Sequence, residues 1–323
     1  MSTRVTRSGE TISLQTRQKI SERYKRMTKA INKAFWNSDS DTAHSLYVGS
    51  YGRGTAIDTS DLDVLIELPK AEYERYDAYR RNGQSRLLQA VKDAVLSTYP
   101  NTYVKPDGQV IKVHFSDGMK FELLPAFPNT DYWGTPTGTY TYADTNNGGN
   151  WKATNPKAEQ QKMRNLNTSS NGLLFDTCKH IRRIRDEHFS SYHLPGIVID
   201  AFVCVAIDGW KWCDDGDGTT PAEPLQYEKH LLTRLQTMRM YFLDTLRSPG
   251  SGQILEWSDS VVYLEKVLME NPPRTDPLHR LRLTHLAIFC LTHKTKIKMT
   301  LSKLAFGRDF LYIVLSSWLT TNQ

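Results

Sequence analysis

The stretch of sequence that decides the fold is Gly-Ser-Tyr-Gly-Arg-Gly-Thr at residues 49–55, followed after a short gap by Asp61-Leu62-Asp63. Gly49 permits the backbone to approach a phosphate closely, because it has no side chain to block one. Ser50 adds a hydroxyl and an amide at the expected start of a helix, where unpaired N–H groups favour an anion. These features predict a phosphate-binding turn directly ahead of two carboxylates.

Asp61 and Asp63 lie at alternate positions of a predicted strand over residues 61–68, so their side chains point to the same face. Adjacent carboxylates repel each other and are costly to ionise unless a cation lies between them. Two Mg²⁺ ions about 3.5–4 Å apart, or Mn²⁺ in their place, would meet this need, activate a hydroxyl and stabilise a leaving pyrophosphate. Glu122 is the candidate third carboxylate, because it is the acidic residue inside the later predicted strands and its neighbours are apolar.

The residues around this stretch predict a mixed α/β front half. Apolar residues from Ile20 to Phe35 recur at steps of three and four, which predicts one long amphipathic helix over residues 13–36. Alternating apolar residues predict strands, and helical spacing predicts one further helix. These elements are strands at 45–48, 61–68, 110–115 and 119–127 and a helix at 84–99.

The back half has a different pattern. Residues 129–171 are rich in Gly, Asn, Thr, Tyr and Pro and poor in aliphatic residues, which predicts an irregular functional segment or a crossing between lobes. Residues 213–218 predict a loop. Helical spacing marks the segments at 172–188, 195–212, 227–246, 258–270 and 274–292.

Composition excludes several classes of protein. Hydrophobic residues make up 39% of the 323 residues, which suffices for a sizeable core and excludes a disordered chain. The 41 Lys and Arg against 35 Asp and Glu leave a net charge of +6, which suits anionic partners without demanding a nucleic acid polymer. The first ten residues lack a signal-peptide core, and the apolar run at 194–207 is interrupted by Asp200 and too short to span a membrane. We therefore expect a cytoplasmic protein with no membrane partner.

The motifs resemble a known superfamily. Gly49-Ser50, then Asp61-x-Asp63, then Glu122 on a later strand is similar to the DNA polymerase β-like nucleotidyltransferases. The long first helix and the sequences of four motifs narrow the resemblance to the bacterial cGAS/DncV-like nucleotidyltransferases. Those motifs are GSYGRGTAI at 49–57, SDLD at 60–63, FELLPAF at 121–127 and GNWKATNP at 149–156.

The resemblance implies an α+β fold with two lobes. A long N-terminal spine helix would occupy residues 1–40. Residues 41–170 would form the nucleotidyltransferase core, with a small mixed sheet that carries the metal site. A helical C-terminal lobe over residues 171–323 would close on the nucleotide cleft.

The resemblance also implies roles for individual residues. Asp61, Asp63 and Glu122 would hold two Mg²⁺ ions, with Glu122 activating the acceptor hydroxyl, while Gly49 and Ser50 grip the donor triphosphate.

Three further roles fall in the helical lobe. Lys179 would reach the triphosphate as the cation opposite the metal site. In a Ser-Ser-Tyr run like that of the animal cGAS enzymes, Ser191 would touch phosphate and Tyr192 would stack on the donor base. Arg182 lies on the same predicted helix as Lys179; it could line the nucleotide cleft, but we expect it at the surface.

The activity implied by the resemblance is the joining of nucleoside triphosphates, ATP and GTP by preference, and their closure into a cyclic di- or trinucleotide messenger. A purine-containing, cGAMP-like product would activate a separate effector protein in bacterial defence against phage. A regulatory partner protein is left open. DNA activation is not supported, because the four cysteines and nine histidines are dispersed and form no zinc-binding cluster like that of animal cGAS. The alternatives are a template-independent RNA or tRNA nucleotidyltransferase, an aminoglycoside-type transferase and, from another class, an inactive nucleotide-sensing module.

Overall fold

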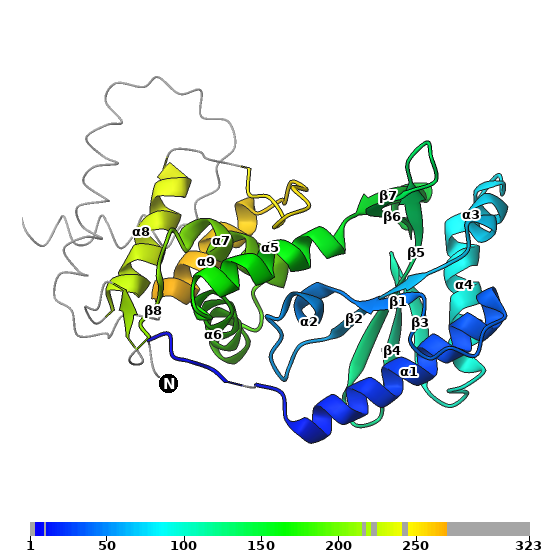
Figure 1. The fold of residues 1–323 in the computed structure, drawn as a ribbon, viewed down its shortest axis with the longest axis horizontal. Helices are drawn as coiled ribbons and strands as arrows, with labels where there is room; N and C mark the ends of the chain where they lie inside the picture. The colour runs from blue at the N-terminus through cyan, green and yellow to red at the C-terminus, as the bar shows by residue number, and fades with distance from the viewer. Residues whose placement is uncertain (1–3, 10, 215–217, 221–224, 241–244, 270–323) are drawn as a thin grey trace, which may run out of the picture. The chain divides into compact units, whose positions relative to one another are not determined.

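The structure is a computed structural model that describes residues 4–9, 11–214, 218–220, 225–240 and 245–269 (Figure 1). Contacts divide the chain into two units, Met1–Pro273 and Arg274–Gln323. The fold described below belongs to the first unit. The helix predicted at 274–292 lies outside the described residues.

A mixed seven-stranded sheet forms the centre of the front half. Strands β2 and β5 run parallel, whereas every other neighbouring pair in this sheet is antiparallel. Along the sheet the order is β1 (Ser45–Tyr47), β2 (Leu62–Glu67), β5 (Lys120–Thr130), β4 (Val110–His114) and β3 (Tyr103–Asp107), with β6 (Pro136–Asp144) on the far part of β5 and β7 (Asn150–Thr154) on β6.

Helix α1 (Leu14–Trp36) covers one face of this sheet together with α4 (Gly83–Leu96). The Ser13 hydroxyl accepts the N–H of Thr16 at 3.1 Å and so caps the first turn, and Asn37 ends the helix in the left-handed conformation. The apolar face of α1 is buried, as its spacing predicts. The long helix predicted at 13–36 is therefore confirmed.

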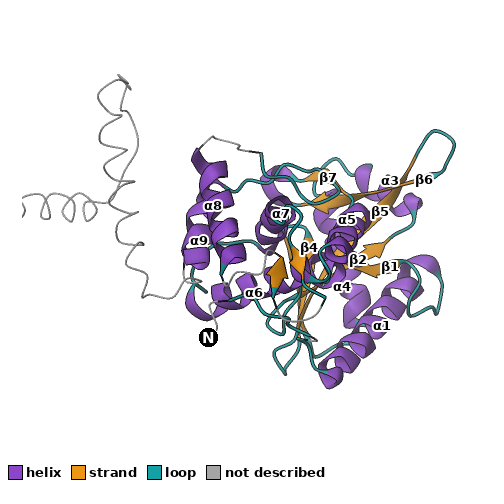
Figure 2. Ribbon diagram, turned by 60° about the vertical axis from the view of Figure 1, so that its left-hand side comes forward, coloured by secondary structure: helices purple, strands orange, loops and turns teal. Residues whose placement is uncertain are grey.

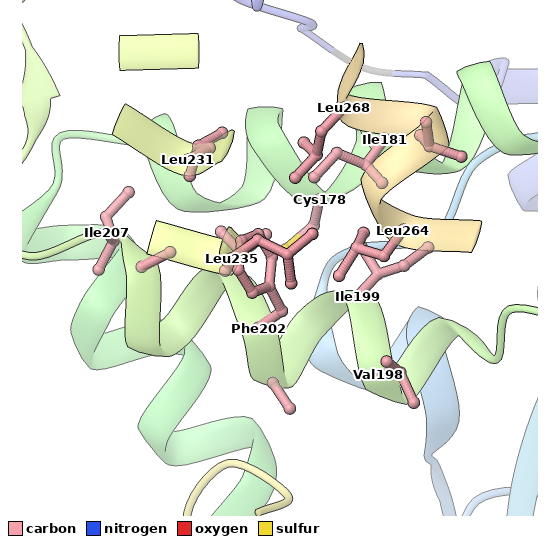
Figure 3. Close-up of a cluster of buried hydrophobic side chains, with 14 of the residues drawn as sticks. Cys178, Ile181, Val198, Ile199, Phe202, Ile207, Leu231, Leu235, Leu264 and Leu268 are labelled. Carbon is pink, nitrogen blue, oxygen red and sulfur yellow. The ribbon is translucent and has the colours of Figure 1, made fainter. Parts of the chain in front are cut away.

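The back half is helical and has its own core. Helices α6 (Leu173–His188), α7 (Gly196–Ala206), α8 (Gln226–Met240) and α9 (Ser258–Met269) surround Phe202 and Cys178, both fully buried (Figure 3). Figure 2 shows these helices grouped together, apart from the sheet with α1 and α4. The prediction of an α+β fold is confirmed.

The N-terminal segment follows the helical lobe before it reaches α1 (Figure 1). Val5 is buried in the helical core, and its N–H donates to the buried Glu228 carboxylate at 2.8 Å. The N–H of Ser8 donates to Asp176 of α6 at 3.0 Å. These contacts fasten the segment before α1 to the helical lobe.

The prediction of an irregular segment at 129–171 is wrong. This region contains the end of β5, β6, β7 and helix α5 (Pro156–Ser169). In β6 the buried residues include Tyr140 and Tyr142, which alternate with threonines, so the strand signal is aromatic rather than aliphatic. Helix α5 begins with Asn155, whose side chain accepts the Ala158 N–H, and with a proline in its first turn.

Smaller differences concern element ends. Helix α7 stops at Ala206, well before Trp212, because Asp208 and Gly209 turn with positive φ and lead into β8 (Lys211–Trp212), which pairs with β9 (Thr219–Thr220). The sequence pattern also failed to predict β3 and the short helix α3 (Lys70–Asp77). In the part of the chain that the structure describes, no helix combines the length and apolar character that crossing a membrane requires.

Candidate active site

The glycine-rich turn packs directly onto one of the predicted carboxylates. Gly49 begins the short helix α2 (Gly49–Arg53) with φ +56°, and a Cβ placed on it would lie 1.8 Å from Oδ2 of Asp63. The N–H of Val48 donates to the Asp63 carbonyl at 2.9 Å, which fixes the turn to β2. Only glycine therefore allows this contact with Asp63, and Ser50 follows it in the first turn of α2.

The parallel pairing of β2 and β5 brings two of the three predicted carboxylates together. Asp63 and Glu122 are register partners, so both project from the same face of the sheet on adjacent strands. Asp61 precedes β2, is half exposed, and has Oδ1 3.9 Å from Nζ of Lys120. The Glu122 carboxylate is half-buried and lies 3.8 Å from Nζ of Lys112.

The electrostatics of this pair are unfavourable without a cation. Burial, together with the charges of Glu122 and Asp61, raises the pKa of Asp63 to about 7 against the opposing effect of the buried Arg53. Burial also raises the pKa of Glu122, against the effect of Lys112. Burial is the main cause of both shifts, and the mutual repulsion of the acids adds to it, so ionising these carboxylates is costly without a further cation.

The donor set fits divalent metal ions. Carboxylate oxygens are the ligands that Mg²⁺ and Mn²⁺ prefer, and Asp63 and Glu122 present them side by side on adjacent strands. Among the described residues, however, no three His, Cys, Asp or Glu side chains already converge as a metal cage. The structure therefore brings Asp63 and Glu122 together, whereas Asp61 has Oδ1 3.9 Å from Nζ of Lys120.

A cavity of about 370 Å³, within the usual size range of small-molecule sites, is lined by Asp63 and Glu122 but not by Asp61. Its lining on the sheet side includes Gly49, Arg53, Asp63, Leu65, Glu122 and Leu124, and Gln109 and Val110 extend it towards the β3–β4 turn. The helical lobe and its neighbouring loop supply Glu159, Ile197, Ser248, Gln253 and Leu255. The carboxylates thus face a cavity that both halves of the described chain enclose.

A buried ion network connects the glycine-rich turn with the helical lobe. The Arg53 guanidinium donates from Nε to Asp200 of α7 at 2.9 Å and from Nη1 to Glu159 of α5 at 3.1 Å. Arg182 of α6 donates to the other Asp200 oxygen at 2.7 Å, and the Thr55 hydroxyl donates to Asp200 as well. Asp200 is fully buried, and Arg53 and Arg182 are nearly so. The network fixes the end of α2 against three helices.

Sequence reasoning missed this network. The expectation that Arg182 lies at the surface is wrong, because Asp200 neutralises it inside the helical lobe. The available signal was Asp200 itself, since an acid in an otherwise apolar helix requires a buried cationic partner.

Three predicted site residues lie elsewhere on the helical lobe. None of Lys179, Ser191 and Tyr192 is among the described residues that line the 370 Å³ cavity. Lys179 lies half-buried on α6, where burial lowers the pKa of its amine. The ring of Tyr192 stacks on Tyr263 with centroids 4.4 Å apart, and the neighbouring Ser191 is exposed.

Solved structures with a similar fold include two CdnE synthases and a CdnC protein. The CdnE cyclic dinucleotide synthase of Elizabethkingia meningoseptica aligns with a TM-score of 0.55 at 13% identity, over 81% of this chain and 93% of that one. The CdnE c-di-GMP synthase of Capnocytophaga granulosa aligns with a TM-score of 0.56 at 14% identity, over 79% and 80%. Escherichia coli CdnC, solved with HORMA-deltaN, aligns with a TM-score of 0.51 at 14% identity, over 80% and 84%. The expected polymerase β-like fold is confirmed.

Sequence comparison assigns the family. No curated protein matches by sequence. The family model described as the Second Messenger Oligonucleotide or Dinucleotide Synthetase domain matches residues 6–167, half of the chain, and this span includes the glycine-rich turn and all three carboxylates. The chain therefore belongs to this synthetase family, the bacterial cGAS/DncV-like nucleotidyltransferases that make cyclic oligonucleotides.

Proposed function

We propose that this chain joins purine nucleoside triphosphates, ATP and GTP by preference, and closes them into a cyclic di- or trinucleotide. The observation that carries the proposal is the Asp63–Glu122 register pair beside the Gly49 turn, at the floor of the cavity. Two Mg²⁺ ions held by Asp61, Asp63 and Glu122 would polarise the donor phosphate and the attacking hydroxyl.

The residues of the chain then divide the work. The Gly49–Ser50 backbone and the Ser50 hydroxyl hold the donor phosphates against β2. Lys179 of α6, which lies outside the cavity lining, would reach them as a further cation. A ribose hydroxyl attacks the α-phosphorus, a phosphodiester bond forms, and the bond to pyrophosphate breaks. Glu122 takes up the hydroxyl proton, and burial raises the pKa of its carboxyl, which favours uptake of a proton. A second attack of the same kind closes the ring.

The wider role is part of the same proposal. A cyclic nucleotide leaves the enzyme and acts at a distance, so we propose that it switches on a separate effector protein in bacterial defence against phage. The Escherichia coli CdnC structure was solved with HORMA-deltaN, a protein partner, which supports control of this chain by a partner protein.

The test is the product itself. The purified full chain is incubated with α-labelled ATP, GTP, CTP and UTP and Mg²⁺, and the products are treated with phosphatase. A small labelled product that resists phosphatase supports the proposal. A ladder of products, or label that appears only when an aminoglycoside is added, would contradict it.

Matched variants make the test specific. Asp61→Asn with Asp63→Asn should abolish the product and leave the fold intact, whereas Asp58→Asn, an exposed acid just before the pair, should not. A double variant with full activity would refute the metal assignment.

A further inference from the structure

The sheet face that carries the two carboxylates continues across β4 and β3, and there its charge changes sign. Register pairs Glu122 with Lys112 of β4, and Lys112 with Lys105 of β3, so the four side chains from Asp63 to Lys105 form one row on one face. Ile111 and Val113, which flank Lys112 along β4, point to the opposite face of the sheet and are fully buried, so the row lies on the outer face.

A second row lies beside the first. Lys120 of β5 is the register partner of His114 on β4, which in turn pairs with Tyr103 on β3. Lys120 and Tyr103 are exposed, and the Tyr103 and His114 rings lie 5.2 Å apart. We call the surface formed by Lys105, Lys112, Lys120 and His114, with Tyr103 at its edge, the cationic shelf.

The three lysines of the cationic shelf differ in how closely they are paired. Lys112 contacts Asp107 at 2.6 Å and Glu122 at 3.8 Å, and Lys120 contacts Asp61 at 3.9 Å. Among the described residues Lys105 has no ion-pair partner, although it is exposed next to Asp107 on the same strand. Lys112 is therefore held mainly by Asp107, Lys120 makes only a long contact with a site carboxylate, and Lys105 is available to an anion.

The shelf and the glycine-rich turn lie on opposite sides of the carboxylate pair. The turn follows β1 and packs onto Asp63 of β2, whereas the shelf lies on β5, β4 and β3, and the strand order is β1-β2-β5-β4-β3. Strands are about 4.8 Å apart, so β4 lies roughly 10 Å from β2. A donor triphosphate bound at the glycine-rich turn would therefore leave the cationic shelf free to bind another anion.

The proposed reaction requires a second place for phosphates. In the first transfer the nucleotide that supplies the hydroxyl keeps its own 5′-triphosphate. That polyanion is repelled by Asp63 and Glu122 and cannot share the turn with the donor triphosphate. Cations on the far side of the carboxylates would hold it while its ribose lies over Glu122.

Resting on the proposed function, we propose that the cationic shelf binds the 5′-triphosphate of the acceptor nucleotide. Lys105, Lys112 and Lys120 supply the charge, and Tyr103 closes the outer edge on the edge strand β3. The ligand class is a nucleoside 5′-triphosphate, recognised through its phosphates rather than its base.

The experiment compares two acceptors that differ only in their phosphates. An α,β-methylene nucleoside triphosphate can accept a nucleotidyl group but cannot donate one, and the matching nucleoside serves as the acceptor without phosphates. Label transferred from an α-labelled donor triphosphate gives kcat/KM for each. In the wild-type chain the triphosphate should be the better acceptor, and Lys105→Glu should reduce that preference at least tenfold while the donor KM stays within twofold.

Controls separate the shelf from general effects. Lys105 lies three strands from Asp63, so Lys105→Glu leaves the carboxylates and the turn unaltered. Lys70→Glu, at an exposed lysine on α3, makes the same charge change elsewhere and should keep the preference. Lys112→Gln should also reduce it. An equal preference in wild type and Lys105→Glu, or no preference in the wild type, would overturn the shelf.

A binding measurement keeps the two proposals distinguishable. If the wild-type chain transfers no label to any acceptor, the proposed function fails. The shelf is then tested by calorimetric titration of the full chain with inorganic tripolyphosphate in EDTA. At least tenfold weaker binding by Lys105→Glu than by Lys70→Glu supports the shelf, and equal binding by the two refutes it.

Discussion

Replacing Gly49 with alanine tests whether the close contact between the glycine-rich turn and Asp63 controls the chemistry. A residue with a Cβ in the left-handed conformation costs about 1–2 kcal/mol. The new Cβ would also lie 1.8 Å from Oδ2 and 2.5 Å from Cγ of Asp63, so the Asp63 side chain must move. Holding it off its preferred rotamer adds about 0.5–1.5 kcal/mol. We therefore expect a total loss of about 1.5–3.5 kcal/mol in the free energy of unfolding.

The effect on activity should be far larger than the effect on stability. A displacement of roughly 1 Å in a group that positions reacting atoms costs about 100-fold in rate. Urea denaturation measures the first effect, and the yield of phosphatase-resistant product measures the second.

Gly118→Ala provides the matched control. Gly118 has φ +87°, and a Cβ added to it would meet no atom within 4 Å, so this variant bears the backbone cost without the contact. It should lose about 1–2 kcal/mol and keep its activity. If Gly49→Ala and Gly118→Ala lose activity equally, or if Gly49→Ala keeps most of it, the contact between the turn and Asp63 does not control the chemistry.

Two further predictions concern buried charge. Asp200→Asn leaves Arg53 and Arg182 without their shared anion, so it should lower the free energy of unfolding by about 3–5 kcal/mol, measured by urea denaturation. Asp117→Asn, which breaks the surface pair with Arg23, is the control and should cost about 1 kcal/mol or less. Burial alone would raise the pKa of Asp200, but Arg182 and Arg53 lower it overall. The loss of stability in Asp200→Asn should therefore be full above the pKa of an unfolded aspartate, about 3.9, and should shrink as the pH falls below that value. Asp63→Asn should instead raise the Tm in EDTA, because burial and Glu122 raise the pKa of Asp63 to about 7. The ionised acid is then unfavourable in the folded state, so the gain should develop between about pH 4 and pH 7 and be full at pH 8; a gain that is equal at pH 4 and pH 8 would contradict it.

Local patterns predicted the elements that carry their own signal. The apolar spacing of α1 and the alternation in β2 are visible in any window of the sequence, because one buried face repeats there. The strands and the helix between 129 and 171 were missed. Strand β6 buries tyrosines that alternate with threonines, and the sequence signal of α5 is its N-cap Asn155 rather than an apolar stripe.

Partners distant in the sequence could not be read from periodicity. The spacing within Asp61-Leu62-Asp63 puts two acids on one face, but only the parallel pairing of β2 with β5 aligns Asp63 with Glu122. The same holds for Lys112 and Lys105, whose alignment with Glu122 depends on the register of β4 and β3. Asp200 stood out as an acid in an apolar helix, yet nothing near it in the chain indicated that Arg53 would be its partner.

Arg53 is where the stability of the fold and the electrostatics of the site meet. Its charge is held in the interior by Asp200 and Glu159, and the same charge opposes the rise in the pKa of the neighbouring Asp63. Without Asp200 the guanidinium would be costly to keep buried, and without the guanidinium Asp63 would be still harder to ionise. Asp200 on α7 therefore favours ionisation of Asp63 on β2, because it holds the Arg53 guanidinium in place. This coupling explains why the turn ends in a buried arginine.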